Sequence, residues 1–494
     1  MRIVKLIALC AGLSAVVSAQ TRYEPNWESL DKRPTPTWFS DAKFGIFIHW
    51  GVYAVPAYAP PQAQGGEAYA EWYWNHLKQG PVNRGRPNPT WEFHKKNYGE
   101  SFPYEDFAPQ FKAEMFDPAQ WAEVFQKSGA KYVVLTSKHH EGFTLWPNSH
   151  ASKSWNRPWN SLEAGPKRDL LGDLAAQVRK QGVRMGVYYS LYEWYNPLWL
   201  TDRKRYVVEH MHPQFKELVT KYRPSVIFSD GEWDLTSDVW KSPELLAWLF
   251  NESPVKDEVA VDDRWGKDTR HKHGGYYTTE YTAGLEGDQH PWEESRGMGF
   301  SYGYNRAERL EHYRTERELI LMLADLVSRG GNLLLDIGPT SDGRIPVIME
   351  ERLLQLGRWL KTNGEAIYQT RPWARTRQWS GGQQPKLETG EFMTRYEVTD
   401  YVERRKPGQA VIEAFFTAKE NDVFAILPGW PGPKLALKGV TAPAGMQVKM
   451  LGRAGTLKWT SAGQDIVVET PPAPSGAAEA QWAYVLKLPG LKTR

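Results

Sequence analysis

The chain has 494 residues, enough for two or three domains with large buried cores. Its formal net charge is only +3 and no long run carries one sign, so nothing in the charge pattern calls for a nucleic-acid or membrane partner. Aromatic residues make up 13% of the chain, which suits a large aromatic core and also sugar binding, because flat rings cover the apolar faces of sugars.

The N-terminus has the features of a signal peptide. Arg2 and Lys5 precede a short apolar stretch that ends in the small residues Val17-Ser18-Ala19. This stretch is shorter than the ~20 apolar residues that a membrane helix requires. We therefore expect residues 1–19 to be cleaved and the protein to be secreted or periplasmic. Cys10 is the single cysteine, so the mature chain would lack disulfides, as in a bacterial exported enzyme.

Short apolar runs alternate with amphipathic helical patterns from about residue 37 to residue 360. The predicted strands are residues 42–49, 131–136, 184–190, 225–230, 258–264 and 332–337. The predicted helices lie between Asp117 and Gly129, between Asp169 and Gly182, and over residues 215–222, 308–328 and 347–360. Apolar strands separated by helices indicate a parallel sheet covered by helices. Over ~330 residues this favours a (β/α)8-like barrel; the alternative, an open doubly wound sheet, lacks a glycine-rich phosphate motif.

The sequence pattern changes after about residue 372, where the alternation of strands and helices gives way to short strands alone. Short strand-like runs separated by Gly, Pro and Asp follow at residues 395–402, 411–417, 423–427, 447–451, 465–469 and 482–488. This pattern is typical of an antiparallel β-sandwich. We therefore expect an α/β catalytic domain over residues 20–375 and a C-terminal antiparallel β-sandwich domain over residues 376–494.

Polar and aromatic side chains follow the predicted strands at the points where those strands end. They include His49, His139, His140, Tyr188, Tyr189, Asp230, Arg264 and Glu280. Active sites of parallel barrels lie at the C-terminal ends of the strands, so these groups should share one rim. Carboxylates among neutral hydrogen-bonding and aromatic groups suit glycoside hydrolysis. In that reaction one carboxyl group attacks the sugar or activates water, and the other protonates the leaving oxygen.

Other interpretations of the same residues remain open at this point. His49, His139, His140 and Asp230 include metal-ligand types. However, adjacent His139 and His140 point in different directions on a strand end, and the sequence has no HExxH spacing. The two histidines could also be hydrogen-bonded core residues, and Asp230 could simply cap a helix or form a turn. We expect neither a metal nor a cofactor.

A series of motifs carries a resemblance to a known family. They are KFGIFIHWGVYAVPAY (43–58), EWYWNH (71–76), AKYVVLTSKHHEGFTLW (130–146), GVYYSLYEWY (186–195), RPSVIFSDGEWD (223–234), DDRWG (262–266), WEESRGMGFSYGYNR (292–306), GGNLLLDIGPTSDGRI (330–345) and NGEAIY (363–368). Residues 38–371 resemble glycoside hydrolase family 29, the α-L-fucosidases, and the C-terminal region resembles the family's second domain. FIHWG and KHHEGF, in that order, are the most specific motifs.

The resemblance implies an exo-acting, retaining α-L-fucosidase acting on fucosylated oligosaccharides or glycoconjugates. Asp230 matches the family's nucleophile, which would form a covalent fucosyl-enzyme. Glu280, in TTEYT, matches the acid/base, and Glu293 in WEES is the rival for that role. Transfer of fucose to an acceptor sugar is an expected side activity, because a sugar hydroxyl can intercept the intermediate.

The resemblance also places the fucose-binding residues. The positions that match hydrogen-bonding groups of the family are His49, Glu71, Trp72, His139, His140, Tyr189 and Arg264. Those that match the apolar wall for the fucose methyl group are Phe47, Phe228 and Tyr302. Family members often have Trp in place of Phe228 and Phe in place of Tyr302, so the shape of this wall can differ.

Two further functions from other classes are compatible with the same sequence. An inactive fucose-binding protein on the same fold would need no catalytic carboxylates, yet both Asp230 and Glu280 are present. A metal-dependent hydrolase would use the histidine cluster and would lose activity to a chelator. Residues 52–115 and 265–305 look like long loops, and these would set the preferred fucose linkage. The sequence does not indicate the oligomeric state.

Overall fold

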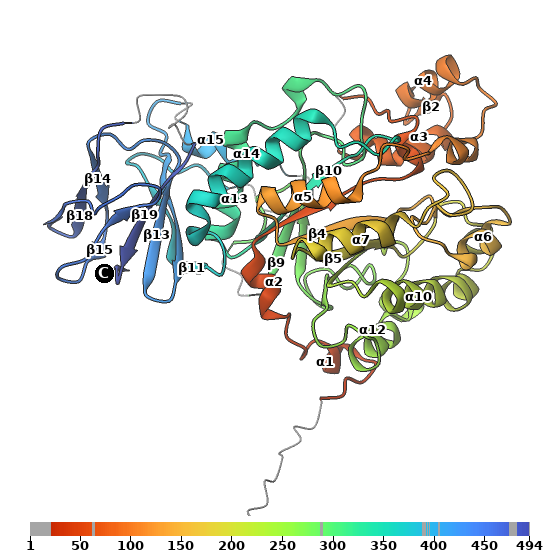
Figure 1. The fold of residues 1–494 in the computed structure, drawn as a ribbon, viewed down its shortest axis with the longest axis horizontal. Coiled ribbons are helices and arrows are strands. Elements are labelled where there is room, and N and C mark those ends of the chain that lie inside the picture. Colours follow the sequence, from red (N-terminus) through yellow and green to blue (C-terminus); the bar gives the residue numbers. More distant parts are fainter. Residues whose placement is uncertain are drawn as a thin grey trace, which may run out of the picture.

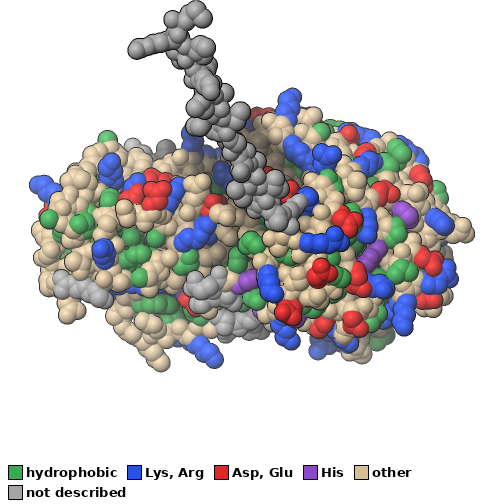
Figure 2. Space-filling view, turned by 90° about the horizontal axis from the view of Figure 1, so that it is seen from below, with side chains coloured by type: hydrophobic (Ala, Val, Ile, Leu, Met, Phe, Trp, Pro, Cys, Tyr) green, Lys and Arg blue, Asp and Glu red, His purple; other side chains and the backbone are tan. Residues whose placement is uncertain are grey.

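The computed structural model describes residues 21–61, 65–286, 290–387, 392, 394, 396–403, 406–473 and 482–493. The predicted signal peptide lies outside these residues. Within them, no helix is long and apolar enough to cross a membrane. Charged side chains of both signs are scattered over the face shown in Figure 2 without a large patch of one sign, in keeping with the small net charge.

An eight-stranded parallel sheet forms the larger part of the structure, with strand order β7-β6-β5-β4-β1-β10-β9-β8. Its strands are β1 Phe44–Ile48, β4 Tyr132–Lys138, β5 Arg184–Ser190, β6 Val226–Asp230, β7 Ala260–Val261, β8 Tyr277–Glu280, β9 Trp292–Gly297 and β10 Asn332–Ile337. A parallel bridge between Asp262 and Tyr276 joins the two outer strands, β7 and β8. The sheet therefore closes on itself, and the predicted (β/α)8-like barrel is confirmed.

Helices cover the outside of this barrel (Figure 1). The longer ones are α5 Pro118–Ser128, α7 Leu170–Lys180, α10 His212–Tyr222, α12 Ser242–Asn251, α13 Glu316–Ser328 and α14 Val347–Asn363. The caps expected from the sequence are formed: Asp117 accepts hydrogen bonds from the first turn of α5, and Gly129 ends that helix at a φ of 87°. Asp169 caps α7 in the same way.

Shorter elements connect these parts. They are α1 Trp27–Leu30, α2 Thr37–Ala42, α3 Tyr73–Lys78, α4 Pro89–Asn97, α6 Ser149–Trp155, α8 Pro197–Thr201, α9 Arg203–Arg205, α11 Ser237–Trp240, α15 Thr399–Val402, β2 Val82–Asn83 and β3 Arg86–Pro87. Single 3₁₀ or π turns occur at Val52–Ala54, Gly65–Ala68, Ala70–Trp72, Tyr104–Gln110, Tyr206–Met211, Leu310–His312 and Gly364–Ala366.

Several predictions about elements are wrong. The stretch 52–115, expected to be a loop, contains α3, β2, β3 and α4. Helix α13 begins at Glu316 rather than at residue 308, because Thr315 and Glu318 form a capping box there. The stretch 265–305, expected to be a loop, contains β8 and β9. Strand β9 (WEESRG) was hidden by its charged residues, which are all buried. The predicted strand at 395–402 instead ends in the helical turn α15, Thr399–Val402.

The C-terminal region is an antiparallel β-sandwich, as predicted. One sheet has the order β11-β12-β13-β19-β16, a second has the order β14-β18-β17, and β15 pairs with β20. The strands are β11 Arg371–Trp379, β12 Ile412–Lys419, β13 Asp422–Leu427, β14 Lys434–Leu437, β15 Val440–Thr441, β16 Lys449–Met450, β17 Trp459–Ala462, β18 Asp465–Glu469, β19 Tyr484–Pro489 and β20 Lys492–Thr493. The predicted domain boundary after residue 375 falls inside β11.

The barrel and the sandwich are joined by a buried contact. Helices α13 and α14 lie between the barrel strands and the sandwich (Figure 1), and α13 packs against β11 and β12. Trp359 of α14 donates a hydrogen bond to the backbone oxygen of Ala483 at 2.9 Å. Ile412 and Phe415 of β12 belong to the same buried hydrophobic cluster as the barrel core. One face of the sandwich therefore packs into the barrel core, while a separate hydrophobic cluster fills the rest of the sandwich.

A buried ionic cluster lies at this contact. Asp325 of α13 accepts hydrogen bonds from Arg329 at 2.7 Å and from Arg377 of β11 at 2.8 Å. The hydroxyl of Tyr396 donates to the same carboxylate at 2.7 Å. Although burial alone would raise the pKa of Asp325, the two guanidinium groups lower it to about 2. Asp325 therefore compensates two buried positive charges that come from different domains.

Replacing Asp325 with Ala should lower the free energy of unfolding by about 3 kcal/mol, because Arg329 and Arg377 would lose their buried partner and keep only the partly exposed Glu286. Glu209→Ala is the matched control, since the pair Arg205–Glu209 is exposed and little stability should depend on it. The midpoint of chemical denaturation, followed by tryptophan fluorescence, measures both. Equal small losses would show that the buried cluster adds no stability.

Candidate active site

A cavity of about 470 Å³ opens at the C-terminal ends of the barrel strands. Its walls include most of the residues singled out from the sequence: Phe47, His49, Glu71, Trp72, His139, His140, Phe228, Asp230, Arg264, Glu280 and Tyr302. Six further residues line it: Tyr69, Tyr188, Trp233, Arg270, Ser295 and Phe392. The barrel therefore gathers side chains from one end of the sequence to the other at a single rim.

Asp230 is the last residue of β6, and two donors fix its carboxylate. Arg264 Nη1 donates to Oδ1 at 3.0 Å, and the hydroxyl of Tyr188 donates to Oδ2 at 2.9 Å. Burial alone would raise the pKa of Asp230, but the Arg264 guanidinium and the Tyr188 hydrogen bond hold it below its usual value. Asp230 is therefore an ionised carboxylate held in one orientation.

Glu280 is the last residue of β8 and contacts the other end of the same guanidinium. Arg264 Nη2 donates to Glu280 Oε2 at 3.3 Å, and the Tyr69 hydroxyl donates to Oε1 at 3.1 Å. Burial raises the pKa of Glu280 despite the opposing charge of Arg264, and the nearby charge of Asp230 raises it further. The site thus pairs a carboxyl group that favours the ionised form with one that favours the protonated form.

Arg264 is itself fixed by three kinds of contact. Besides the two carboxyl groups, its Nε donates to Thr278 Oγ1 at 3.0 Å, and its guanidinium carbon lies 4.8 Å from the centre of the Phe228 ring. Burial would lower the pKa of Arg264, but the surrounding carboxylates raise it well above its usual value. The side chain therefore stays charged, although only 2% of its surface is exposed.

The His140 imidazole is held in one tautomer. Its Nδ1 lies 2.7 Å from Ser190 Oγ, and that hydroxyl donates its hydrogen to the backbone oxygen of Tyr192. Nδ1 must therefore be the donor. Burial lowers the pKa of His140 well below its usual value, so the ring is neutral. Its Nε2, 3.5 Å from Asp230 Oδ2, is left as an acceptor.

His49 and Glu71 lie on the cavity wall and are both deeply buried. His49 Nδ1 lies 2.6 Å from Oδ1 of Asp336 on neighbouring β10, and burial lowers the pKa of His49 well below its usual value. Glu71 accepts hydrogen bonds from the Gly303 backbone N–H at 2.8 Å and from Ser301 at 3.3 Å. Burial raises the pKa of Glu71 to about 7. Both side chains can therefore form neutral hydrogen bonds with a sugar.

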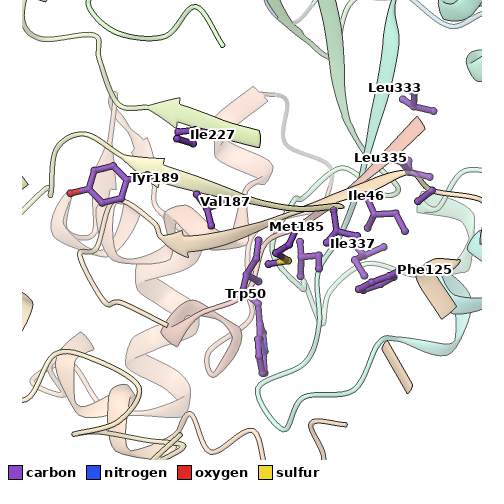
Figure 3. Close-up of a cluster of buried hydrophobic side chains, with 14 of the residues drawn as sticks. Ile46, Trp50, Phe125, Met185, Val187, Tyr189, Ile227, Leu333, Leu335 and Ile337 are labelled. Carbon is purple, nitrogen blue, oxygen red and sulfur yellow. The ribbon is translucent and has the colours of Figure 1, made fainter. Parts of the chain in front are cut away.

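The structure corrects the prediction for Tyr189, which does not reach the cavity. Its hydroxyl donates to Gln214 at 2.8 Å, and its ring packs against Phe215 on the helix side of the sheet. Figure 3 shows Tyr189 with Val187 among the core side chains. Because side chains alternate along a strand, the neighbouring Tyr188 faces the cavity instead. Because Tyr188 and Tyr189 are adjacent and identical, the sequence alone does not show which of them faces the cavity and which faces the helices.

Glu293, the rival acid, also lies outside the cavity lining. It is fully buried on β9, where the Tyr132 hydroxyl donates to its Oε2. Burial raises the pKa of Glu293 to about 8, despite the hydrogen bond from Tyr132. Since a general acid must come within hydrogen-bond reach of its substrate, this position does not suit the role.

Some lining residues had no recognisable signal in the sequence. Trp233 follows Asp230 closely but lies in a polar stretch, and Arg270, whose Nε donates to Glu232 at 2.7 Å, lies in a predicted loop. Phe392 lies between β11 and β12 of the sandwich, far along the chain from the barrel strands. Across the described part of the chain, no group of three or more His, Cys, Asp or Glu side chains is arranged to hold a metal ion.

Comparisons with known proteins give a consistent result. The family model described as alpha-L-fucosidase matches residues 10–365, and the model described as alpha-L-fucosidase C-terminal domain matches residues 410–489. The tissue alpha-L-fucosidase of Homo sapiens is 42% identical over 481 residues, covering 95% of this chain and 92% of the human protein. An alpha-L-fucosidase of Branchiostoma floridae is 42% identical over 98% of this chain and 99% of its own length.

Solved structures agree with the sequence relatives. The crystal structure of the Thermotoga maritima alpha-fucosidase in complex with fucose matches with a TM-score of 0.74 and 36% identity. That match covers 94% of this chain and 100% of the other. The similarity therefore extends through both the barrel and the sandwich.

Replacing Glu293 with Gln should flatten the dependence of stability on pH. In the unfolded chain the Glu293 carboxyl loses its proton near pH 4.5, whereas in the folded protein, with a pKa of about 8, it keeps the proton to higher pH. Stability therefore falls as pH rises from about 4.5 to 8, by on the order of 3–5 kcal/mol. Chemical denaturation at a series of pH values measures this fall. Glu293→Gln should lose it, whereas exposed Glu28→Gln should retain it; identical curves for all three proteins would contradict the assignment.

Proposed function

The chain belongs to the α-L-fucosidase family, and from this we propose that it removes terminal α-L-fucose from glycans or glycoconjugates with retention of configuration. The observation that carries the proposal is the contact of one guanidinium, that of Arg264, with both Asp230 and Glu280. Retaining glycosidases hold their two carboxyl groups ~5–5.5 Å apart, whereas inverting ones need ~6.5–9.5 Å for a water molecule. Because one guanidinium contacts both carboxyl groups, Asp230 and Glu280 lie close together, which favours the shorter spacing of a retaining enzyme.

In the first step the Asp230 carboxylate attacks the anomeric carbon of fucose. The bond from that carbon to the leaving oxygen breaks, and Glu280 donates its proton to that oxygen, so the aglycone departs as an alcohol. The lowered pKa of Asp230 and the raised pKa of Glu280 suit these opposite roles. The product is a covalent fucosyl-enzyme in which the anomeric configuration has been inverted once.

In the second step Glu280, now ionised, takes a proton from a water molecule. The water oxygen attacks the anomeric carbon, the ester bond to Asp230 breaks, and fucose leaves with its original configuration. A sugar hydroxyl that takes the place of the water would give transfer of fucose instead of hydrolysis. The Arg264 charge lies beside both carboxyl groups and stabilises whichever of them is ionised.

The hydrogen-bonding side of the cavity fits the fucose hydroxyl groups. We assign this role to His49, Glu71, Trp72, His139, His140 and Arg264, with Tyr188 in place of Tyr189. Phe47, Phe228 and Tyr302 supply the apolar wall for the methyl group. The Tyr302 hydroxyl lies 3.0 Å from Ser295 Oγ and 3.2 Å from its backbone oxygen, so its polar end is satisfied without the sugar.

The alternative of an inactive fucose-binding protein would use the same wall without the chemistry. The tuned carboxyl pair favours the enzyme, since a binding protein gains nothing from a buried acid beside an ionised carboxylate. Export with removal of residues 1–19 remains part of the proposal and rests on the sequence alone.

Azide rescue separates the two carboxyl roles. On an aryl α-L-fucoside, Asp230→Ala should lose about 10³-fold or more of kcat, and azide should restore turnover with β-fucosyl azide as product. Glu280→Ala should form the fucosyl-enzyme from the activated substrate, and azide should yield α-fucosyl azide. Glu293→Gln is the control and should retain activity. Near-normal hydrolysis of a poor leaving group by Glu280→Ala would refute its role, and loss of wild-type activity to a chelator would favour the metal-dependent alternative.

Tyr188→Phe should move the acidic limb of the pH profile upward. Losing the hydrogen bond raises the pKa of Asp230, and activity disappears as pH falls through that pKa. A hydrogen bond to a charged group is worth ~1.5–3 kcal/mol, so the limb should shift by about one pH unit or more. The measurement is kcat/KM against pH. Tyr189→Phe should leave the limb in place; the opposite pattern would reinstate Tyr189 as the cavity residue.

A further inference from the structure

Phe392 is a cavity residue that comes from the connection between β11 and β12 of the sandwich. It lines the same cavity as Asp230 and Glu280, and it forms a parallel bridge with Glu280 at the end of β8. Yet 51% of its surface is exposed. Because this exposed aromatic ring lines the cavity beside the two carboxyl groups, it is available to pack on a ligand there.

The chain that carries Phe392 is anchored a few residues further on. Arg296 of β9, next to β8 in the sheet, donates to the backbone oxygen of Tyr396 at 3.1 Å. The Tyr396 hydroxyl donates to buried Asp325, and the carboxylate of Glu397 accepts from Arg314. These contacts attach Tyr396 and Glu397 to β9, which pairs with β8, and to α13 and the residues just before it.

The chemistry at Glu280 determines what such a ring would meet. An acid that protonates the leaving oxygen must lie beside the first residue of the leaving group. Phe392 pairs with that acid through the backbone, so its exposed ring faces the space where the leaving group begins. A second exposed aromatic, Trp233, lines this cavity with 38% of its surface accessible, and Trp72 stacks on it at 5.9 Å.

We propose that Phe392 is a specificity-determining residue that binds the leaving sugar, a pyranose whose apolar C–H face packs on the phenyl ring. The proposal rests on the proposed function, because the leaving sugar is defined by the fucosyl bond that Glu280 helps to break. It gives the sandwich domain a part in substrate choice: the barrel supplies the fucose site, and the connection between β11 and β12 supplies a wall for the sugar to which fucose is attached.

The test compares two substrates that differ only in the leaving group. α-L-Fucosyl fluoride has no leaving sugar, whereas a fucosyl disaccharide does. Phe392→Ala should lower kcat/KM on the disaccharide about tenfold more than on the fluoride, the equivalent of one aromatic packing contact. Phe392→Tyr, which keeps the ring, should restore most of this difference. Phe300→Ala is the matched control, because Phe300 is a phenylalanine of similar exposure (46%) and does not line the cavity.

Each outcome decides between the possibilities. An equal loss on both substrates would show that Phe392 only supports the site, and no loss on either would show that the ring meets no ligand; both overturn the proposal. If the wild-type protein hydrolyses neither substrate, the proposed function fails first. If it hydrolyses both and Phe392→Ala does not discriminate, the function stands and the subsite alone is rejected.

Discussion

The structure depends on one buried cation, Arg264, placed between two carboxyl groups. A guanidinium with so little exposure is stable only when acceptors surround it, and Asp230, Glu280 and Thr278 provide them. The cation in turn moves the pKa values of Asp230 and Glu280 apart, because it favours the ionised form more strongly for Asp230, to which its contact is shorter. Without it, two neighbouring carboxyl groups in a buried cavity would both be driven towards the neutral form.

Closure of the barrel makes this arrangement possible. Asp230 ends β6 and Glu280 ends β8, and these strands are separated in the sheet order only by the short β7 and the Asp262–Tyr276 bridge. Arg264 lies in the loop just after that bridge, so the loop reaches both strand ends. The two-residue length of β7 is therefore an advantage, because it leaves the chain free to turn inward where a full strand would continue past the site.

The sequence predicted much of this site because apolar strands ending in polar residues are a local signal. Asp230 and His49 could be found in that way. The same signal marked both Tyr188 and Tyr189 but could not show which of them faces the cavity, since adjacent identical residues leave strand parity undetermined until neighbouring strands are in place. Strand β9 was missed because its buried charges are neutralised by partners that the sequence pattern does not reveal: Arg296 pairs with Glu294 on the same strand and with the distant Glu397. Phe392 was out of reach because its place in the cavity depends on tertiary contacts made by Tyr396.

The buried cluster around Asp325 also limits how the two domains can be exchanged with those of other proteins during evolution. Arg377 and Tyr396 lie beyond the barrel helix that carries their carboxylate partner. A recombination event that exchanged the second domain would leave Asp325 and Arg329 without two of their neighbours, unless the incoming segment supplied an equivalent arginine and hydroxyl at matching positions. We therefore expect substitutions at Asp325 and Arg329 in the barrel to be paired with substitutions at Arg377 and Tyr396, so that the two domains are not readily exchanged one at a time. A fusion protein that uses this barrel should also include the chain as far as Glu397.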